Sequence, residues 1–303
     1  MSKAHWVALS MIPGIGGATA RKLVERFGTV DAVFEADESA LLAVPRITPD
    51  ITRQIRNALL ENVEAELVSL DDEGITVLAL EDNGYPELLR GASDAPSVLF
   101  VRGLVQPADT RAIAIIGTRE PSDRGLQTAQ RLASELAARG WTVISGLALG
   151  IDTAAHRGAL AARDGRTLAV LGSGLRVVHP RENAGLAEEI STRGALLSEL
   201  HPSTPPRGPQ LMARDRIISG LSCAVIVVEA GEKSGSLDTA SKARRQSRLV
   251  LAVPGSPGTD QLIASGATSV KVGQVDWGEL MARIEQSLRT SPALGNVQQA
   301  SLW

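Results

Sequence analysis

The sequence predicts an α/β fold in which helices cover both faces of a parallel β-sheet. From Arg111 onward, short apolar runs alternate with amphipathic segments of helical spacing, the pattern of repeated strand–helix units. Three of these runs end in turns of small residues that lead into a helix, as in open parallel sheets. With 303 residues, the chain is long enough for one large domain or two medium ones.

Residues 1–70 are expected to form a small all-α domain ahead of the sheet. Leu9–Gly28 contains a Pro-Gly-Ile-Gly turn, and residues 18–27 follow with an apolar face at helical spacing. Two helices around such a turn resemble a SAM-like helix-hairpin-helix module. Leu41–Ile55 is a candidate for a second, degenerate copy, with Pro45-Arg46-Ile47-Thr48 in place of the glycines.

In the helix-hairpin-helix family, the hairpin contacts DNA phosphates without reading sequence. Here the hairpins stand among the acidic residues Asp31, Glu35, Asp37 and Glu38, which repel phosphate. The sequence therefore favours a structural or partner-docking role for residues 1–70 and leaves DNA contact open.

Residues 71–290 are expected to form the sheet domain, with Glu61–Asp72 as a charged helical connector before it. A first strand is expected at Ile75–Leu80, and Tyr85–Gly103 reads as a turn-rich segment that ends in a strand. The later strands are expected at 113–116, 142–144, 167–171, 195–197, 224–228 and 249–253. The helices are expected at 124–139, 153–162, 182–192, 215–219, 237–246, 260–264 and 276–288. The polar segment 291–303 is expected to be a flexible tail.

The bulk composition predicts a cytoplasmic protein with no membrane contact. No apolar run approaches the roughly 18 residues that cross a bilayer, and the first residues do not resemble a signal peptide. The single cysteine, Cys223, excludes an intramolecular disulfide, and its place at the head of an apolar run predicts a buried structural thiol.

The charge distribution points to an anionic partner for the second part of the chain. The net charge is −3, but residues 1–100 hold 8 basic and 16 acidic residues, whereas residues 101–303 hold 23 and 18. Residues 201–250 alone hold 8 basic and 4 acidic residues. A basic stretch of this kind suits an anionic ligand, although Arg244, Arg245 and Arg248 equally fit a solvated helix face.

Three turns form the candidate anion-binding site. The segment Val143–Leu160 reads as a strand, a glycine-rich turn at Ser145-Gly146 and a helix that opens at Asp152. The same arrangement follows the strands that end near Ile116 and Val228. Backbone N–H groups at a helix N-terminus attract phosphate, and the carboxyl ends of neighbouring parallel strands share one crevice. The turn residues are Gly117, Thr118, Arg119, Ser145, Gly146, Ser234, Gly235 and Ser236.

Charged side chains near these turns complete the predicted site. Arg119, Arg214 and Arg216 are expected to contact successive phosphates, because a guanidinium offers a rigid fork of donors. Lys233 and Lys242 add positive charge. Three further residues are expected to support the site: Asp215 as a helix cap or an arginine partner, Glu229 as a carboxylate that orients an arginine, and Thr239 in the first turn of a helix.

Asp152 and His156 are expected to be structural residues. Asp152 is placed to cap the helix, and His156 lies four residues on, on the same face. The alternatives are a metal site or a catalytic pair, but the chain has only four histidines and no clustered ligands around this one. A P-loop, a dinucleotide fingerprint and a nucleophile elbow are also missing from the sequence. We therefore predict no metal, no cofactor and no catalytic residue.

Taken together, these motifs strongly resemble the DNA-processing protein DprA/Smf family. The resemblance rests on the segments 117–119, 145–160, 167–175, 214–222, 227–240 and 252–267, in that order. It implies an extended Rossmann-like fold, single-stranded DNA binding, a homodimer and loading of the RecA recombinase during natural transformation. It also implies that Arg119, the Ser145-Gly146 turn, Arg214, Arg216 and the Ser234-Gly235-Ser236 turn line the DNA groove, without catalytic activity.

The sequence departs from the family pattern where the Phe-Pro before the arginine pair is replaced by Leu211-Met212, and where the intervening Asn is replaced by Asp215. His179 stands where a tyrosine is usual, and only 3% of all residues are aromatic. Single-strand binders commonly stack bases on aromatic rings. We therefore expect the affinity to depend mainly on phosphate contacts and to fall steeply with salt.

Two other functions remain open from the sequence. One is a sensor of a nucleotide-derived ligand or a nucleotide N-glycosidic hydrolase on the same scaffold, which the turn Pro254–Thr259 loosely resembles. The other is a structural adaptor that docks through the acidic N-terminal module.

Overall fold

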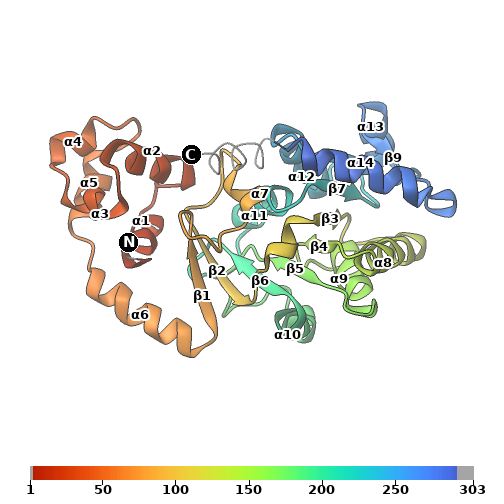
Figure 1. The fold of residues 1–303 in the computed structure, drawn as a ribbon, viewed down its shortest axis with the longest axis horizontal. Helices are drawn as coiled ribbons and strands as arrows, with labels where there is room; N and C mark the ends of the chain where they lie inside the picture. The colour runs from red at the N-terminus through yellow and green to blue at the C-terminus, as the bar shows by residue number, and fades with distance from the viewer. Residues whose placement is uncertain (1–2, 292–303) are drawn as a thin grey trace.

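The computed structural model describes residues 3–291, except for the side chain of Gln274. Six helices lead into the sheet domain: α1 (Lys3–Met11), α2 (Gly17–Phe27), α3 (Val30–Glu35), α4 (Glu38–Leu42), α5 (Pro49–Arg56) and α6 (Leu60–Asp72). Figure 1 shows α1–α5 gathered at one end of the molecule and α6 extending from them towards the first strand.

The strands of the sheet domain are β1 (Ile75–Ala79), β2 (Val98–Gly103), β3 (Ala112–Ile116), β4 (Thr142–Ser145), β5 (Thr167–Val170), β6 (Ala195–Ser198), β7 (Ala224–Val227), β8 (Leu249–Ala252) and β9 (Thr268–Ser269). Its α-helices are α7 (Glu87–Arg90), α8 (Asp123–Ala138), α9 (Ile151–Ala161), α10 (Ala184–Arg193), α11 (Gly208–Gly220), α12 (Gly235–Arg245), α13 (Pro257–Ala264) and α14 (Trp277–Arg289). Short 3-10 helices span Pro107–Thr110, Arg181–Asn183 and Val272–Gln274.

The nine strands form one sheet in the order β1-β2-β6-β5-β4-β3-β7-β8-β9. β2 pairs antiparallel with both β1 and β6, and all other pairs are parallel. The chain starts the parallel part at β3, builds β4, β5 and β6 on one side, and then returns to place β7 on the other side. The strand order therefore reverses between β3 and β7, which is where open α/β sheets bind ligands.

Two apolar clusters cover the faces of this sheet. α8, α9 and α14 pack against one face through residues such as Leu132, Ala155 and Ile284. α11 and α12 cover the other face through residues such as Ile217 and Ala240. The structure thus has the predicted α/β class with helices on both faces, although the antiparallel β1–β2 extension was not anticipated.

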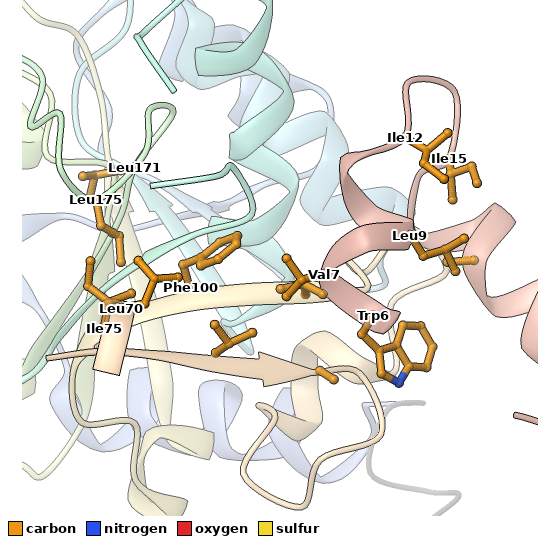
Figure 2. Close-up of a cluster of buried hydrophobic side chains, with 14 of the residues drawn as sticks. Trp6, Val7, Leu9, Ile12, Ile15, Leu70, Ile75, Phe100, Leu171 and Leu175 are labelled. Carbon is orange, nitrogen blue, oxygen red and sulfur yellow. The ribbon is translucent and has the colours of Figure 1, made fainter. Parts of the chain in front are cut away.

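A third cluster joins the N-terminal helices to the sheet. Trp6, Val7 and Leu9 of α1 belong to the same group of buried side chains as Ile75 of β1 and Phe100 of β2 (Figure 2). Gly17 at the start of α2 lies against the loop before β2, because a Cβ atom there would stand 1.8 Å from the carbonyl oxygen of Ala95. The helical domain is therefore packed onto the sheet rather than tethered to it.

One expected helix is much longer than predicted. The sequence places a helix at 215–219, whereas α11 begins at Gly208, with Pro209 in its first turn. Proline is well tolerated at that position because the first helical N–H groups have no partner within the helix. As a result, Arg214 and Arg216 lie inside a helix. Asp215 was expected at a helix N-terminus, but it lies in the middle of α11.

Ser291, the first residue of the predicted flexible tail, is buried and accepts a hydrogen bond from Arg248. The rest of that prediction, 292–303, lies outside the described residues. Within residues 3–291, no helix combines the length and the apolar character needed to cross a membrane.

Candidate phosphate-binding site

The loops after β3, β4 and β7 meet at the point where the strand order reverses. The N–H of Thr118 donates to the carbonyl oxygen of Glu229 at 2.8 Å, and the N–H of Ile151 donates to that of Thr118 at 3.2 Å. Gly150 has a φ of +80°, and a Cβ atom there would lie 2.5 Å from the Thr118 oxygen. The close approach of these loops therefore depends on a glycine at this turn.

A cavity of about 500 Å³ opens beside these loops, between the N-terminal turns of α12 and the middle of α11. We call it the Asp215 pocket. Its lining includes Gly117, Thr118, Arg119, Glu120, Asp152, Arg214, Asp215, Ser234, Gly235, Ser236 and Thr239. Most of the predicted site residues therefore come together, although they contribute in different ways.

Arg119 is the exposed cation of the site. It lies in the turn after β3, and no hydrogen bond or ion pair joins its guanidinium to another described residue. Arg119 thus keeps its donors available for a ligand, and a guanidinium can bind phosphate in a bidentate manner.

Arg214, by contrast, is built into the protein. It is 5% exposed, and its Nη1 donates to the carbonyl oxygens of Gly146, at 2.6 Å, and Val170. Its Nε lies 3.1 Å from Oδ1 of Asp215. A Cβ atom on Gly146 would stand 2.5 Å from the Nη1 atom, so this glycine makes room for the guanidinium. Arg214 therefore holds the β4 loop against α11 and offers little to a ligand.

Asp152 holds the same loop from the other side. Its Oδ2 accepts hydrogen bonds from the N–H groups of Gly146, at 3.1 Å, and Ala148, at 3.4 Å. The cap of α9 is Gly150, so the predicted capping role of Asp152 is wrong: it lies within the first turn and reaches back to the loop. Burial raises the pKa of Asp152 to about 6, and the nearby Arg214 partly offsets this.

The Ser145-Gly146 turn is consequently closed to a phosphate. Ser145 is fully buried and donates its hydroxyl to the carbonyl oxygen of Ile115 at 2.7 Å. The N–H of Gly146 already donates to Asp152. The expectation that this turn cradles an anion is corrected by these contacts, because the carboxylate of Asp152 occupies the place an anion would take.

His156 is sealed in the interior. Its Nδ1 lies 2.7 Å from Oγ1 of Thr167, and burial lowers its pKa to about 3. A neutral, buried imidazole can neither bind phosphate nor exchange protons with a ligand, which fits the structural role expected for it.

Arg216 points away from the pocket. Its Nη1 and Nη2 donate to the carboxylate of Glu199, at 2.8 and 2.6 Å. Residues two apart on a helix face different directions. The predicted clamp by Arg214 and Arg216 is therefore wrong, since the two guanidinium groups do not face a common space.

Glu229 also differs from expectation. Its carboxylate accepts from the hydroxyl of Ser122, at 2.7 Å, and from its N–H. Ser122 is the N-cap of α8. Glu229 therefore fixes the start of α8 and does not orient an arginine.

The start of α12 contributes hydroxyl groups to the Asp215 pocket. Ser234 is the N-cap, and Ser236 and Thr239 are buried side chains that line the pocket. Lys233 is exposed beside them. Lys242 is engaged elsewhere, because its Nζ donates to the carbonyl oxygen of Met212 and to Asp238, the latter at 2.5 Å.

A second cavity of about 480 Å³ adjoins the first and shares Arg119, Ala148, Leu211 and Arg214 with it. We call it the Arg181 pocket. It adds Arg181 and His179, from the loop before α10. Arg181 was not predicted from the sequence, where its only signal is a Pro-Arg pair in a turn that follows β5.

The two pockets differ in charge. With histidine neutral, the Arg181 pocket is lined by three arginines and Glu182, whereas the Asp215 pocket is lined by two arginines and three carboxylates. Within residues 3–291, no group of three His, Cys, Asp or Glu side chains could hold a metal ion. Cys223 is buried, and burial raises its pKa to about 12. The chemistry on offer is anion binding at Arg119 and Arg181.

A family model described as DNA recombination-mediator protein A matches residues 76–278, and one described as SAM-like Helix-hairpin-helix tandem matches residues 7–61. The second match confirms the predicted hairpin module and its degenerate second copy. The first agrees with the family resemblance drawn from the motifs.

The chain is 37% identical over 265 residues to the DNA processing protein DprA of Bacillus subtilis. This alignment covers 82% of the chain and 89% of that relative. Two relatives named Protein Smf, from Synechocystis and Escherichia coli, are matched over a smaller share of their length. The alignments cover 65% of the first and 58% of the second.

Among solved structures, DprA of Streptococcus pneumoniae has a TM-score of 0.78 and 30% identity, over 90% of this chain and 96% of that one. The structure of DprA of Helicobacter pylori, solved to describe its single-stranded DNA binding mode, has a TM-score of 0.61 and 29% identity. The match covers 72% of this chain and 97% of that one. These matches confirm the Rossmann-like fold with an N-terminal helix-hairpin-helix domain.

Proposed function

This chain belongs to the DNA recombination-mediator protein A family, whose members are also named DprA and Smf, and from that premise we propose that it binds single-stranded DNA as a recombination mediator. In this proposal the strand is DNA that enters by natural transformation. The protein protects the strand and loads RecA onto it, acts in the cytoplasm as a homodimer and catalyses no reaction.

The observation that carries the proposal is the free guanidinium of Arg119 between two adjoining pockets. Arg181 lies in the positive pocket beside it. Two cations at the carboxyl ends of parallel strands suit successive phosphates of a nucleic-acid strand. The relative from Helicobacter pylori, whose structure describes single-stranded DNA binding, supports the same assignment.

Phosphate contacts are proposed to supply most of the affinity. Neither pocket is lined by Phe, Tyr or Trp, and the single tyrosine, Tyr85, is buried against the carbonyl oxygen of Pro96. Without a stacking platform, binding depends on neutralised phosphates, and each one steepens the slope of log affinity against log salt by about 0.7 for a single strand.

The test is a fluorescence-anisotropy titration with a labelled single-stranded oligonucleotide at several salt concentrations. Arg119→Ala is expected to weaken binding of all sequences alike, about tenfold at moderate salt, and to lower the magnitude of the salt slope by about 0.7. Arg163→Ala is the matched control, because Arg163 is also exposed but lies between α9 and β5, at the amino ends of the parallel strands.

Equal losses in the two variants, or a slope that Arg119→Ala leaves unchanged, would remove Arg119 from the site. A shallow slope for the unmodified protein would instead show that phosphate contacts do not dominate.

The homodimer and the recombinase have separate tests. Sedimentation at micromolar concentrations should give twice the mass of the chain. A strand-exchange assay with RecA and a single-strand binding protein should show faster filament formation when the protein is added. A monomer, or RecA kinetics without change, would restrict the proposal to DNA binding.

A further inference from the structure

The Asp215 pocket is a poor place for a phosphate, although it adjoins the positive pocket. Three carboxylates and two arginines line it, and one of these arginines is Arg214. The side chain of Arg214 is 6% exposed, whereas that of Asp215 is 15% exposed. The carboxylate of Asp215 is therefore the more accessible member of this ion pair.

The remaining walls suit the ring of a nucleobase. Ile116 and Ile218 are apolar and line the cavity, and Leu211 stands between the two pockets. The hydroxyl of Thr239 adds a polar group. A cavity of about 500 Å³ is large enough for a small heterocycle, and apolar walls with a few convergent polar groups are typical of such sites.

We propose that the Asp215 pocket takes a base of the bound strand, while its phosphate lies between Arg119 and Arg181, and that Asp215 selects bases with an exocyclic amino group. This inference rests on the proposed single-stranded DNA binding and names a preference of that same site. An ionised carboxylate only accepts hydrogen bonds, as when Asp or Glu accepts from the N4 amino group of cytosine.

Uracil and thymine are disfavoured for the converse reason. Each carries a carbonyl oxygen where cytosine carries its amino group, and that oxygen would face a carboxylate with no proton between them. A carbonyl oxygen that is buried without a hydrogen-bond donor loses its hydrogen bond to water. This loss weakens binding by more than one satisfied hydrogen bond strengthens it. The carboxylate of Asp215 therefore acts by attraction of one base type and repulsion of the other.

The experiment compares oligo(dC) with oligo(dU) of equal length, because these pyrimidines differ at the amino or carbonyl position without the methyl group of thymine. Titrations at about pH 8 keep cytosine neutral. Burial raises the pKa of Asp215, with the opposing effect of Arg214, so a mildly basic solution also favours its ionised form. The unmodified protein should bind oligo(dC) about tenfold more tightly than oligo(dU).

Asp215→Asn is the test variant, since an amide of the same shape can donate to a carbonyl group. In this variant the ratio of the affinity for oligo(dC) to that for oligo(dU) should fall to about two or less. Glu232→Gln is the control: it removes one negative charge from the exposed loop after β7, outside both pockets. It should raise the affinity for both oligomers equally and leave the ratio unchanged.

A ratio near one for the unmodified protein, or a ratio that Asp215→Asn leaves intact, would overturn the base preference while single-stranded DNA binding stands. Failure of the proposed function would look different, because neither oligomer would then bind the unmodified protein.

Discussion

At the scale of single residues, two buried charged side chains hold the loop after β4, which borders both pockets. Arg214 and Asp152 grip the loop after β4 from opposite sides, one through the carbonyl oxygen of Gly146 and the other through its N–H. Leu147, between them, has a φ of +59° and is fully buried. A bulky residue in the left-handed region persists only where its surroundings over-determine it, and here these two charged side chains do so.

The titration of Asp152 gives a prediction with a defined sign. Its pKa of about 6 exceeds the usual 3.8, so folding favours the protonated carboxyl, and that stabilisation is lost as the pH rises through 6. Asp152→Asn removes the titration. The free energy of unfolding of the variant, relative to the unmodified protein, should therefore rise by about 2 kcal/mol between pH 4 and pH 7, at ~1.4 kcal/mol per pKa unit.

Urea unfolding at several pH values measures this difference. Asp164→Asn, at a side chain that is 94% exposed, serves as the reference for a solvated carboxylate. A difference between Asp152→Asn and the unmodified protein that stays constant or shrinks with rising pH would show that Asp152 is ionised without penalty in the folded state.

Residue types alone could not separate the free arginine from the buried ones. Arg119 was predictable as a site residue because it lies in the turn that follows a predicted strand. Arg214 and Arg216 were assigned to phosphate because the helix was expected to begin after them, whereas α11 starts at Gly208 and turns them to opposite sides. Arg181 went unnoticed because only the tertiary fold brings the loop before α10 beside Arg119.

At the scale of elements, the alternation of apolar runs and helices was enough to predict the parallel strands from β3 to β8 within one or two residues. The antiparallel addition of β1 and β2 was not predictable, since a strand's pairing partner depends on long-range contacts. β2 lies beside β6, whose residues come almost a hundred positions later.

The two hairpins of the helical domain allow a direct comparison of one turn built with and without glycine. Gly14 has a φ of +92°, and Arg46, at the equivalent place in Pro45-Arg46-Ile47-Thr48, has a φ of +74°. A side chain in this region costs about 1–2 kcal/mol, partly offset by the greater chain entropy that glycine loses on folding. Arg46→Gly should therefore raise the free energy of unfolding by up to about 1 kcal/mol.

Gly14→Ala should act in the opposite direction. It adds a Cβ atom to a positive φ and places that atom 3.1 Å from Cδ1 of Ile51 in α5. Chemical denaturation of both variants tests the pair, and a destabilising Arg46→Gly would mean that the arginine side chain makes a stabilising contact that outweighs its backbone strain.

At the scale of the whole molecule, the acidic helical domain and the sheet domain share one core. The cluster around Trp6, Val7 and Phe100 crosses from α1 to β2 (Figure 2). Arg176 also pairs with Glu73 at 2.6 Å, and His201 lies 2.6 Å from Glu66 of α6. Domains that bury apolar side chains in common are expected to unfold together rather than one after the other.

Gly17 and Gly16 provide a matched test of this coupling. A Cβ atom on Gly17 would collide with the carbonyl oxygen of Ala95 at 1.8 Å, whereas one on Gly16 would meet nothing within 4 Å. Gly17→Ala should lower the free energy of unfolding by about 1–3 kcal/mol, as overpacking does, and Gly16→Ala should have little effect.

Two single-tryptophan backgrounds report on the two domains, one retaining Trp6 in α1 and the other Trp141, directly before β4. Because the core is shared, the urea transitions seen by the two reporters should coincide, and Gly17→Ala should move both midpoints by the same amount. If Gly17→Ala shifted the Trp6 transition and left that of Trp141 in place, the helical domain would be an independent folding unit, and its contact with β1 and β2 would not stabilise the sheet that carries the candidate phosphate-binding site.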